Sequence, residues 1–246
     1  MRFRRPGPAP AADDVADPGR GIELRGVSHR YGDRPVLDGL DLTLTEARIG
    51  VVGANGSGKS TVARLLNGLV VPSEGRVLVD GLDTRTQVRA VRRRVGFVFQ
   101  DPDAQIVLPT VAEDVAYGLE NQGVPPDERA ARVAEVLERH GLAGHADHPA
   151  HLLSGGQKQL LAIAGVLVMR PARIVFDEPT TLLDLVNARR VAELIAGLEQ
   201  QVVVVTHQLD LLDGFDRVLV VDRGRVVEDA PPGPAVAAYR ALMTDR

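Results

Sequence analysis

The pairing of two glycine-rich segments constrains this chain more than any other feature. The first, Gly53–Ser60, has the pattern G-x-x-x-x-G-K-S and stands between a short apolar strand and a helix. Its glycines let the backbone curl so that N–H groups meet phosphate oxygens, and the helix adds its positive N-terminal end. The second, Leu153–Gln157, reads L-S-G-G-Q and precedes an apolar strand that ends in Asp177 and Glu178. One nucleotide site does not need two such segments. The pair therefore predicts two chains that meet head to tail, each lending its second segment to the other's nucleotide.

Apolar periodicity predicts an α/β fold, and the motif at Gly53–Ser60 adds that it is of the P-loop nucleotide-binding type. Strands are predicted at 22–27, 40–44, 48–52, 76–79, 95–99, 173–176, 202–205 and 218–221. Helices are predicted at 59–69, 111–119, 126–140, 160–169 and 187–198. Because strands and helices alternate and most strands are continuously apolar, we expect a mainly parallel core sheet covered on both faces. Residues 22–27 and 40–44 alternate apolar and polar side chains, which is typical of edge strands.

The sequence predicts one nucleotide-binding domain over residues 21–232, with a helical subdomain inserted at about 101–165. After residue 101, Pro, Asp and Glu accumulate, and helical stretches occur without a convincing strand. Ser154 is predicted to cap the helix that follows it. We expect a disordered tail at 1–20, which is rich in Pro, Ala, Asp and Arg, and a short helix at 233–246.

Composition excludes several classes of protein. The 29 basic and 33 acidic residues give a slightly negative chain, which argues against nucleic acid as a partner. The absence of cysteine excludes disulfides, zinc-thiolate sites and thiol nucleophiles, and is typical of a reducing compartment. The longest uncharged apolar run, 160–169, is shorter than the ~20 residues of a membrane-spanning helix. We therefore expect any membrane role to depend on a partner.

The first glycine-rich segment supplies most candidate nucleotide-binding residues. They are Gly53, Asn55, Gly56, Ser57, Gly58, Lys59, Ser60 and Thr61, with Tyr31 upstream. Lys59 would reach the β- and γ-phosphates of ATP, and the Ser60 hydroxyl would hold Mg²⁺. An aromatic face at Tyr31 could stack on adenine, although an ordinary core or surface tyrosine is an equal alternative. A plain glycine-rich turn is the alternative for the loop, and the strand and helix that flank it argue against that.

Polar side chains at strand ends supply the candidate catalytic and metal-binding residues. Asp177 can orient Mg²⁺ together with Ser60, and Glu178 can accept the proton of an attacking water. Gln100, after the strand at 95–99, can touch the metal shell and sense the γ-phosphate. His207, after the strand at 202–205, can hydrogen-bond the γ-phosphate as a neutral imidazole and help to position water. The alternatives are a simple strand-ending turn for the two acids, an ordinary loop residue for Gln100 and a satisfied polar group for His207.

The second glycine-rich segment predicts an anion site that acts between chains. Ser154, Gly155 and Gly156 offer a hydroxyl and two unencumbered N–H groups at a helix N-terminus, followed by Gln157. Within one subunit the helical insertion separates them from Lys59. In a two-fold dimer they would close over the γ-phosphate in the partner's site.

Two other clusters are given ordinary roles. Three histidines spaced by three, namely His145, His148 and His151, suggest a metal site, but Pro149 prevents a helix and no acidic or cysteine partner stands at ligand spacing. The basic residues Arg89, Arg92, Arg93 and Arg94 predict a solvated helix face, with a lipid-headgroup contact as the alternative.

These segments, in this order, resemble the ATPase subunits of ATP-binding cassette (ABC) transporters over about residues 22–230. The resemblance implies an ABC-type nucleotide-binding domain with an antiparallel β edge subdomain, and two subunits that sandwich two ATP molecules. Each site would be built from Lys59, Ser60, Gln100, Asp177, Glu178 and His207 of one chain and Ser154–Gln157 of the other. Asp184 matches the family's acidic residue after the catalytic glutamate, which helps to couple the two sites across the dimer.

Finer features resemble the energy-coupling factor branch of importers for vitamins and metal ions. Residues 99–107 and 110–119 are similar to that branch, and Gly165 stands where many other ABC ATPases have arginine. Residues 178–185 and the pair Leu160–Leu161 resemble the biotin-importer version. The branch implies a second ABC ATPase subunit (identical or paralogous), an integral membrane coupling subunit and a substrate-binding membrane subunit. It also implies a peripheral location on the cytoplasmic face of the cell membrane.

Three positions depart from the family pattern, namely Ala47, Leu160 and Leu182. None is a catalytic group, so we expect ATP hydrolysis, while the packing of the dimer interface is open. The alternatives are an importer of cobalt, nickel or another vitamin, a non-transport ABC protein, and a regulatory module that does not hydrolyse ATP.

Overall fold

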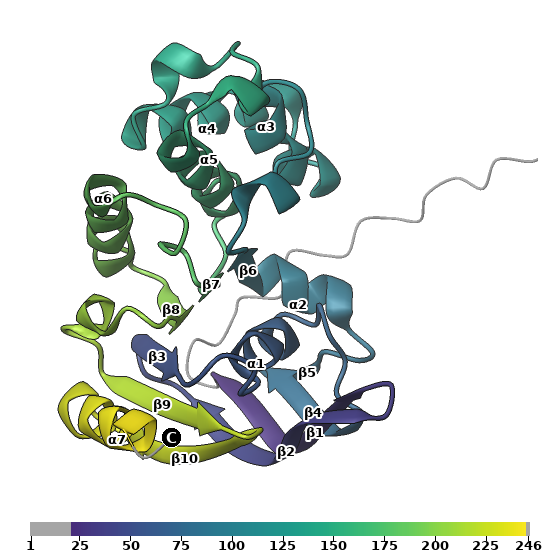
Figure 1. The fold of residues 1–246 in the computed structure, drawn as a ribbon. Helices are drawn as coiled ribbons and strands as arrows, with labels where there is room; N and C mark the ends of the chain where they lie inside the picture. The colour runs from purple at the N-terminus through teal and green to yellow at the C-terminus, as the bar shows by residue number, and fades with distance from the viewer. Residues whose placement is uncertain (1–20, 245–246) are drawn as a thin grey trace, which may run out of the picture.

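The computed structural model describes residues 21–244, so the tail predicted at 1–20 lies outside the described residues. The strands are β1 (Ile22–Tyr31), β2 (Arg34–Leu44), β3 (Arg48–Val52), β4 (Glu74–Val79), β5 (Leu82–Asp83), β6 (Val95–Val98), β7 (Arg173–Asp177), β8 (Gln201–Val205), β9 (Arg217–Asp222) and β10 (Arg225–Ala230). The α-helices are α1 (Lys59–Leu66), α2 (Val88–Arg94), α3 (Val111–Asn121), α4 (Pro126–Arg139), α5 (Gly155–Leu167), α6 (Leu185–Ala196) and α7 (Pro232–Thr244). Together they form an α/β fold with two sheets (Figure 1).

The larger sheet has the order β10-β9-β3-β8-β7-β6. Strands β9, β3, β8, β7 and β6 run parallel, and only β10 is antiparallel to its neighbour. The central strands are buried along almost their whole length, which explains their continuous apolar sequence. The mainly parallel core sheet is therefore confirmed, and the carboxyl ends of its strands share one edge, where the candidate site lies.

The smaller sheet has the order β2-β1-β4-β5 and is antiparallel. Strand β1 pairs with both β2 and β4, so the expectation that residues 22–27 form an edge strand is wrong. Alternation along β1 arises because Ile22, Leu24 and Val27 are buried on one face while intervening side chains are more exposed. Alternation of apolar and polar residues indicates that one face of a strand is buried, but it does not indicate whether the strand lies at the edge of its sheet.

Helix α1 lies between the two sheets and joins them. It contacts β7 and β8 of the larger sheet and β2 and β4 of the smaller one. Its residues Val62, Ala63, Leu65 and Leu66 belong to a hydrophobic core shared by both sheets. The helix ends at Leu66, earlier than predicted, and Asn67 caps it. This packing fixes the loop in front of α1 relative to the strand ends.

The segment between β6 and β7 contains helices α3, α4 and α5, which form a lobe beyond the end of the larger sheet (Figure 1). The helices predicted at 111–119 and 126–140 are confirmed. A capping box between Thr110 and Glu113 begins α3. Helix α5 begins at Gly155, earlier than predicted, directly after its N-cap Ser154. The division of the chain into domains stays a prediction.

Sequence patterns missed helix α2 and strand β10, as well as the two-residue strand β5. Helix α2 buries Val91 alone, so it has no apolar stripe to find. Strand β10 is exposed or half-buried throughout and is held by pairing with β9. Both depend on tertiary contacts more than on their own composition.

Candidate active site

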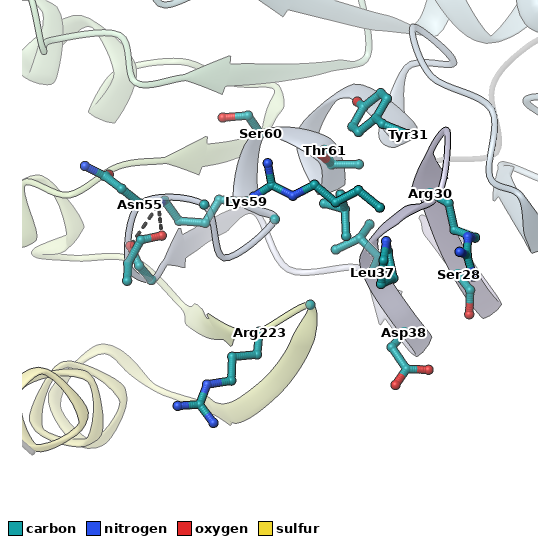
Figure 2. Close-up of a pocket in the computed structure, with 18 of the residues that line it drawn as sticks. Ser28, Arg30, Tyr31, Leu37, Asp38, Asn55, Lys59, Ser60, Thr61 and Arg223 are labelled. Carbon is teal, nitrogen blue, oxygen red and sulfur yellow. Dashed lines mark hydrogen bonds between the residues drawn. The ribbon is translucent and has the colours of Figure 1, made fainter. Parts of the chain in front are cut away.

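A cavity of ≈1170 Å³ opens where the loop before α1 meets the carboxyl ends of the larger sheet. Many residues proposed from sequence line it, namely Tyr31, Gly53, Asn55, Gly56, Gly58, Lys59, Ser60, Thr61, Gln100, Glu178 and His207. Figure 2 places Tyr31 and Arg30 on one side of the loop and Arg223 on another. The cavity therefore brings together residues from distant parts of the chain.

Lys59 folds back over the loop that precedes it. Its Nζ donates hydrogen bonds to the carbonyl oxygens of Gly53 at 2.8 Å and Ala54 at 3.0 Å (Figure 2). The side chain is buried, and this burial lowers the pKa of Lys59, while the carboxylates of Glu178 and Asp177 act in the opposite direction. The ammonium is thus held at the cavity wall by weak partners that a phosphate oxygen can replace.

The backbone of the loop requires glycine at two positions. Gly58 has φ 111°, and a Cβ there would lie 2.7 Å from Cδ2 of Leu37. Gly53 has φ 154°, and a Cβ there would lie 2.1 Å from the carbonyl oxygen of Val221. The loop is also tied to the turn before β10, because the N–H of Gly224 donates to the carbonyl of Ser57 at 3.0 Å. Close approach of β2 and β9 therefore sets the loop's shape.

Ser60 and Asp177 form the candidate metal-binding pair. The Ser60 hydroxyl donates a 2.8 Å hydrogen bond to Oδ1 of Asp177, which ends β7. Burial raises the pKa of Asp177, and the hydrogen bond from Ser60 and the charge of Arg64 partly offset this. Arg64 lies one helical turn after Ser60, with its guanidinium 3.9 Å from Oδ2 of Asp177.

Glu178 is held in a strained and well-anchored position. Its φ of 54° is in the left-handed region, which non-glycine residues rarely adopt. Its N–H donates to the carbonyl of Val205 at 2.9 Å, across to β8. Oε2 accepts from the Thr181 hydroxyl at 3.0 Å and from the backbone N–H of His207 at 3.3 Å. The carboxylate is therefore fixed at the cavity wall through one oxygen.

His207 contacts the same carboxylate oxygen. Its Nδ1 lies 2.7 Å from Oε2 of Glu178. An ionised carboxylate only accepts, so Nδ1 carries the proton and donates it. A neutral imidazole of that form has a bare Nε2, which cannot donate to a phosphate. With a single N–H, the neutral imidazole expected from sequence can donate to Glu178 or to a γ-phosphate, but not to both at once.

The second glycine-rich segment lies apart from this cavity, because none of Ser154–Gln157 is among its lining residues. Ser154 caps α5, and its Oγ accepts from the N–H of Gln157 at 3.3 Å. Gly156 packs against Asn187, since a Cβ there would lie 2.4 Å from Oδ1 of that side chain. Asn187 is in turn held by Asp184, the N-cap of α6, through two hydrogen bonds of 2.8 Å. Within one chain, Asp184 and the second segment are thus in indirect contact.

Several lining residues were not predicted. Arg30 and Arg34 of the β1–β2 hairpin, Arg223 of the turn before β10 and Tyr239 of α7 enter the cavity through tertiary pairing, which no sequence pattern marks. A contact of Thr181 with Glu178 was predictable from the sequence, because the hydroxyl of Thr181 follows Glu178 by three residues in the same turn.

Comparison with known proteins identifies the family. The model of the ABC transporter family matches residues 37–181. The chain belongs to the ABC transporter ATPases. It is 64% identical to an ABC transporter ATP-binding protein of Deinococcus radiodurans, over 91% of this chain and 99% of that one, whose name assigns no substrate. It is 48% identical to the biotin transport ATP-binding protein BioM of Rhizobium etli, over 90% of this chain and 97% of that one.

A solved structure agrees with this assignment. The dimeric post-hydrolysis state of an ATP-binding cassette, bound to ADP and Pi, superposes with a TM-score of 0.77 at 30% identity, covering 86% of this chain and 98% of that one. The chain is therefore an ATP-binding ATPase of the ABC type, as its sequence motifs predict. Among residues 21–244, no helix is both long and apolar enough to cross a bilayer.

Proposed function

We propose that this chain is the ATP-hydrolysing subunit of an energy-coupling factor importer. One observation carries the ATP-hydrolysing role, and the importer branch is proposed from similarity. The Lys59 loop, the Ser60–Asp177 pair and the Glu178–His207 pair converge on one cavity, while Ser154–Gln157 remain outside it. Such a chain has everything needed to bind ATP and activate water, and one phosphate-binding segment left for a partner.

ATP would bind with its phosphates in the loop at the start of α1. The exchange of carbonyl partners for phosphate oxygens lets Lys59 neutralise the β- and γ-phosphates. Loop N–H groups and the positive end of α1 add further donors. Tyr31, half-exposed at the cavity wall, is available to stack on the base.

The residues present are suited to Mg²⁺. A hydroxyl at Ser60, a carboxylate at Asp177 and an amide oxygen at Gln100 are hard oxygen donors. Among residues 21–244, no group of three or more His, Cys, Asp or Glu residues could hold a metal alone. Bound Mg²⁺ would supply charge neutralisation at the β- and γ-phosphate oxygens.

Glu178 would act as the general base. Hydrolysis forms a bond between the water oxygen and the γ-phosphorus, breaks the bond to the β–γ bridging oxygen and leaves a water proton on the carboxylate. The oxygen Oε2 is occupied by Thr181 and His207, so Oε1 is the one available to water. His207 would hydrogen-bond the γ-phosphate and hold it beside that water.

A second ABC ATPase subunit, identical or paralogous, would complete each site. Ser154, Gly155, Gly156 and Gln157 of one subunit would close over the γ-phosphate bound by the other. Shared phosphate charge favours the closed dimer, and hydrolysis with phosphate release lets it open. Asp184, placed beside the second segment through Asn187, would couple the two sites.

The transported substrate is proposed from similarity. Biotin is supported by the likeness to BioM and by residues 178–185, with cobalt, nickel or another vitamin as the alternative. The partners would be an integral membrane coupling subunit and a substrate-binding membrane subunit, with this chain peripheral on the cytoplasmic face of the membrane. The acidic residues Glu113, Asp114 and Glu120 of α3 are a candidate contact for a short helix of the membrane partner.

Co-purification followed by uptake tests this proposal. A tagged chain should bring down integral membrane proteins and an ABC ATPase subunit, and reconstituted vesicles should take up labelled biotin with ATP. The Lys59→Ala variant should abolish uptake while the complex still assembles. Uptake of metal ions or another vitamin would support the alternative substrates. Recovery of ribosomes or DNA without membrane proteins would contradict a role in transport.

A further inference from the structure

A histidine outside the ATP cavity contacts the second glycine-rich segment. Nε2 of His145 lies 3.0 Å from Nε2 of the Gln157 side chain. His145 ends a 3-10 turn, η2 (Ala143–His145), which follows α4. Its ring also meets the ring of His148 edge-on, with centroids 5.0 Å apart. The proposed function gives His145 no part.

The hydrogen-bond directions of this contact are determined by its neighbours. Oε1 of Gln157 accepts from the backbone N–H of Ser154 at 2.9 Å. The amide NH₂ must therefore face His145, so Nε2 of the imidazole accepts and its proton sits on Nδ1. That Nδ1 is buried and has no hydrogen-bond partner among the described residues. The ring is thus held by its acceptor nitrogen.

Gln157 links this histidine to the group that would meet the partner's nucleotide. The Ser154 hydroxyl oxygen accepts from the N–H of Gln157, which leaves its own hydrogen free to donate. Of the two capping-box bonds, the one from the N–H of Ser154 to Oε1 depends on the orientation of the Gln157 side chain, and the other uses the backbone N–H of Gln157. If its amide group rotated, Oε1 would leave the N–H of Ser154 and the cap would lose one of its two bonds.

We propose that His145 is a positioning residue for the ATP-bridged dimer. Its imidazole acceptor fixes the amide plane of Gln157, and that amide holds Ser154 in the geometry that donates to a γ-phosphate in the other subunit. The inference rests on the proposed function, because it requires Ser154 to act between chains. It adds a residue of the helical lobe that is not among the residues lining the ATP cavity.

Two variants of similar size separate the acceptor from ring packing. His145→Gln retains an amide oxygen that can reach the position of Nε2, whereas His145→Leu keeps bulk and has no acceptor. Both are made in the full-length Glu178→Gln chain, in which slow hydrolysis preserves ATP-bound dimers. His148→Ala serves as a control that removes the ring contact only.

Three quantities are measured. They are the association of chains with ATP by light scattering, the affinity of each chain for a fluorescent ATP analogue at low protein concentration, and the melting temperature. We expect His145→Leu to weaken ATP-driven association about fivefold or more, the scale of one hydrogen bond. His145→Gln and His148→Ala should associate like the parent, and analogue affinity should stay unchanged in all.

The outcomes are distinguishable. If the parent associates with ATP and His145→Leu associates equally well, the positioning role is overturned while the proposed dimer stands. Failure of His145→Gln to restore association would also overturn it, because packing would then explain the effect. If the parent chain does not self-associate in the presence of ATP, the proposed ATP-bridged dimer of identical chains is contradicted, and the positioning role of His145 is overturned with it.

Discussion

The Ser60 hydroxyl hydrogen-bonds to Asp177 at 2.8 Å, although Ser60 lies in the first turn of α1 and Asp177 ends β7. In a mainly parallel sheet, the carboxyl ends of neighbouring strands and the helix N-termini that follow them share one edge. Burial of Asp177 there has a cost in the absence of a cation, since burial raises its pKa. The proposed Mg²⁺–nucleotide complex would relieve this cost.

Asp177→Asn should separate stability from function. Asparagine keeps an acceptor for Ser60 and removes the buried charge, so the nucleotide-free chain should gain stability within the ~0.5–2 kcal/mol range of favourable substitutions. Mg²⁺-dependent ATP binding should weaken about tenfold or more, because the carboxylate is lost. Thermal unfolding with and without Mg-ATP measures both effects. Equal stabilisation of parent and variant by Mg-ATP would contradict the metal role.

The same burial gives a pH dependence of stability. A carboxyl whose folded pKa is raised binds more protons in the folded chain than in the unfolded one. Its unfavourable contribution therefore grows as pH rises from its ordinary value through the raised value, and is relieved as pH falls back through that window. The stability difference between parent and Asp177→Asn should shrink with falling pH. A constant difference across the window, in urea titrations of both chains, would contradict the cause assigned to the shift.

Glu178→Gln should slow ATP hydrolysis by about 10²-fold or more, on the order expected for loss of a general base. Glutamine keeps an acceptor for Thr181 and His207, so ATP binding and ATP-driven dimers should persist. Phosphate release measures the rate, and scattering measures the dimers. Glu138→Gln, an exposed acid on α4, is the matched control and should hydrolyse ATP at the parental rate. A parental rate in Glu178→Gln would remove its role as base.

Lys59→Ala should act one step earlier, on binding. Without the ammonium, the β- and γ-phosphates lose a charged donor, so affinity for ATP should fall about tenfold or more. Titration with a fluorescent ATP analogue measures this directly. Because Lys59 bonds only loop carbonyls in the present structure, the melting temperature without nucleotide should change little. Full retained affinity would contradict the assignment of the loop.

Features that depend on local sequence were predictable, whereas contacts between distant segments were not. The loop before α1, the strand ends at Asp177 and Glu178 and the cap at Ser154 depend on local pattern and strand–helix order, so they could be predicted. The internal position of β1 could not, because alternation reports burial on one face and says nothing of neighbours. The contact between Nδ1 of His207 and Glu178 could not be predicted either, because it depends on the side-chain rotamer of His207 and on its distance from the carboxylate.

Contacts that join distant segments were also beyond sequence reasoning. Nothing in the pattern around Gly156 indicates that Asn187 packs over it, because the two lie on different helices, α5 and α6. Tyr239 reaches the cavity only because α7 packs on β9 and β10. The positions of Asn187 and Tyr239 depend on how helices and strands pack against one another, and the periodicity of the sequence does not encode that packing.

Gly156→Ala should destabilise the chain, and Gly155→Ala should not. An added Cβ at 156 would lie 2.4 Å from the Asn187 side chain, whereas one at 155 would meet nothing within 4 Å. Overpacking of this kind costs about 1–3 kcal/mol, while alanine for glycine in a helix gains up to ~1 kcal/mol. Urea unfolding of the two variants gives the comparison. The double variant Gly156→Ala with Asn187→Ala should recover part of the loss, and equal stability of both single variants would refute the contact.

Arg173 and Asp80 form a buried ion pair whose halves should be strongly interdependent. The guanidinium makes two hydrogen bonds of 2.7 Å to the carboxylate, and its Nε donates to Gln201 at 2.6 Å. Arg173→Met removes both of these hydrogen bonds and leaves the buried carboxylate with the longer contact to Arg94 at 3.6 Å, so it should cost up to about 3–5 kcal/mol of unfolding free energy. Arg173→Met combined with Asp80→Asn should cost less than the sum of the single changes, because the carboxylate that lost its two hydrogen bonds is then also removed. Urea unfolding of the single and double variants measures the coupling, and strict additivity would show that the pair acts as two independent residues.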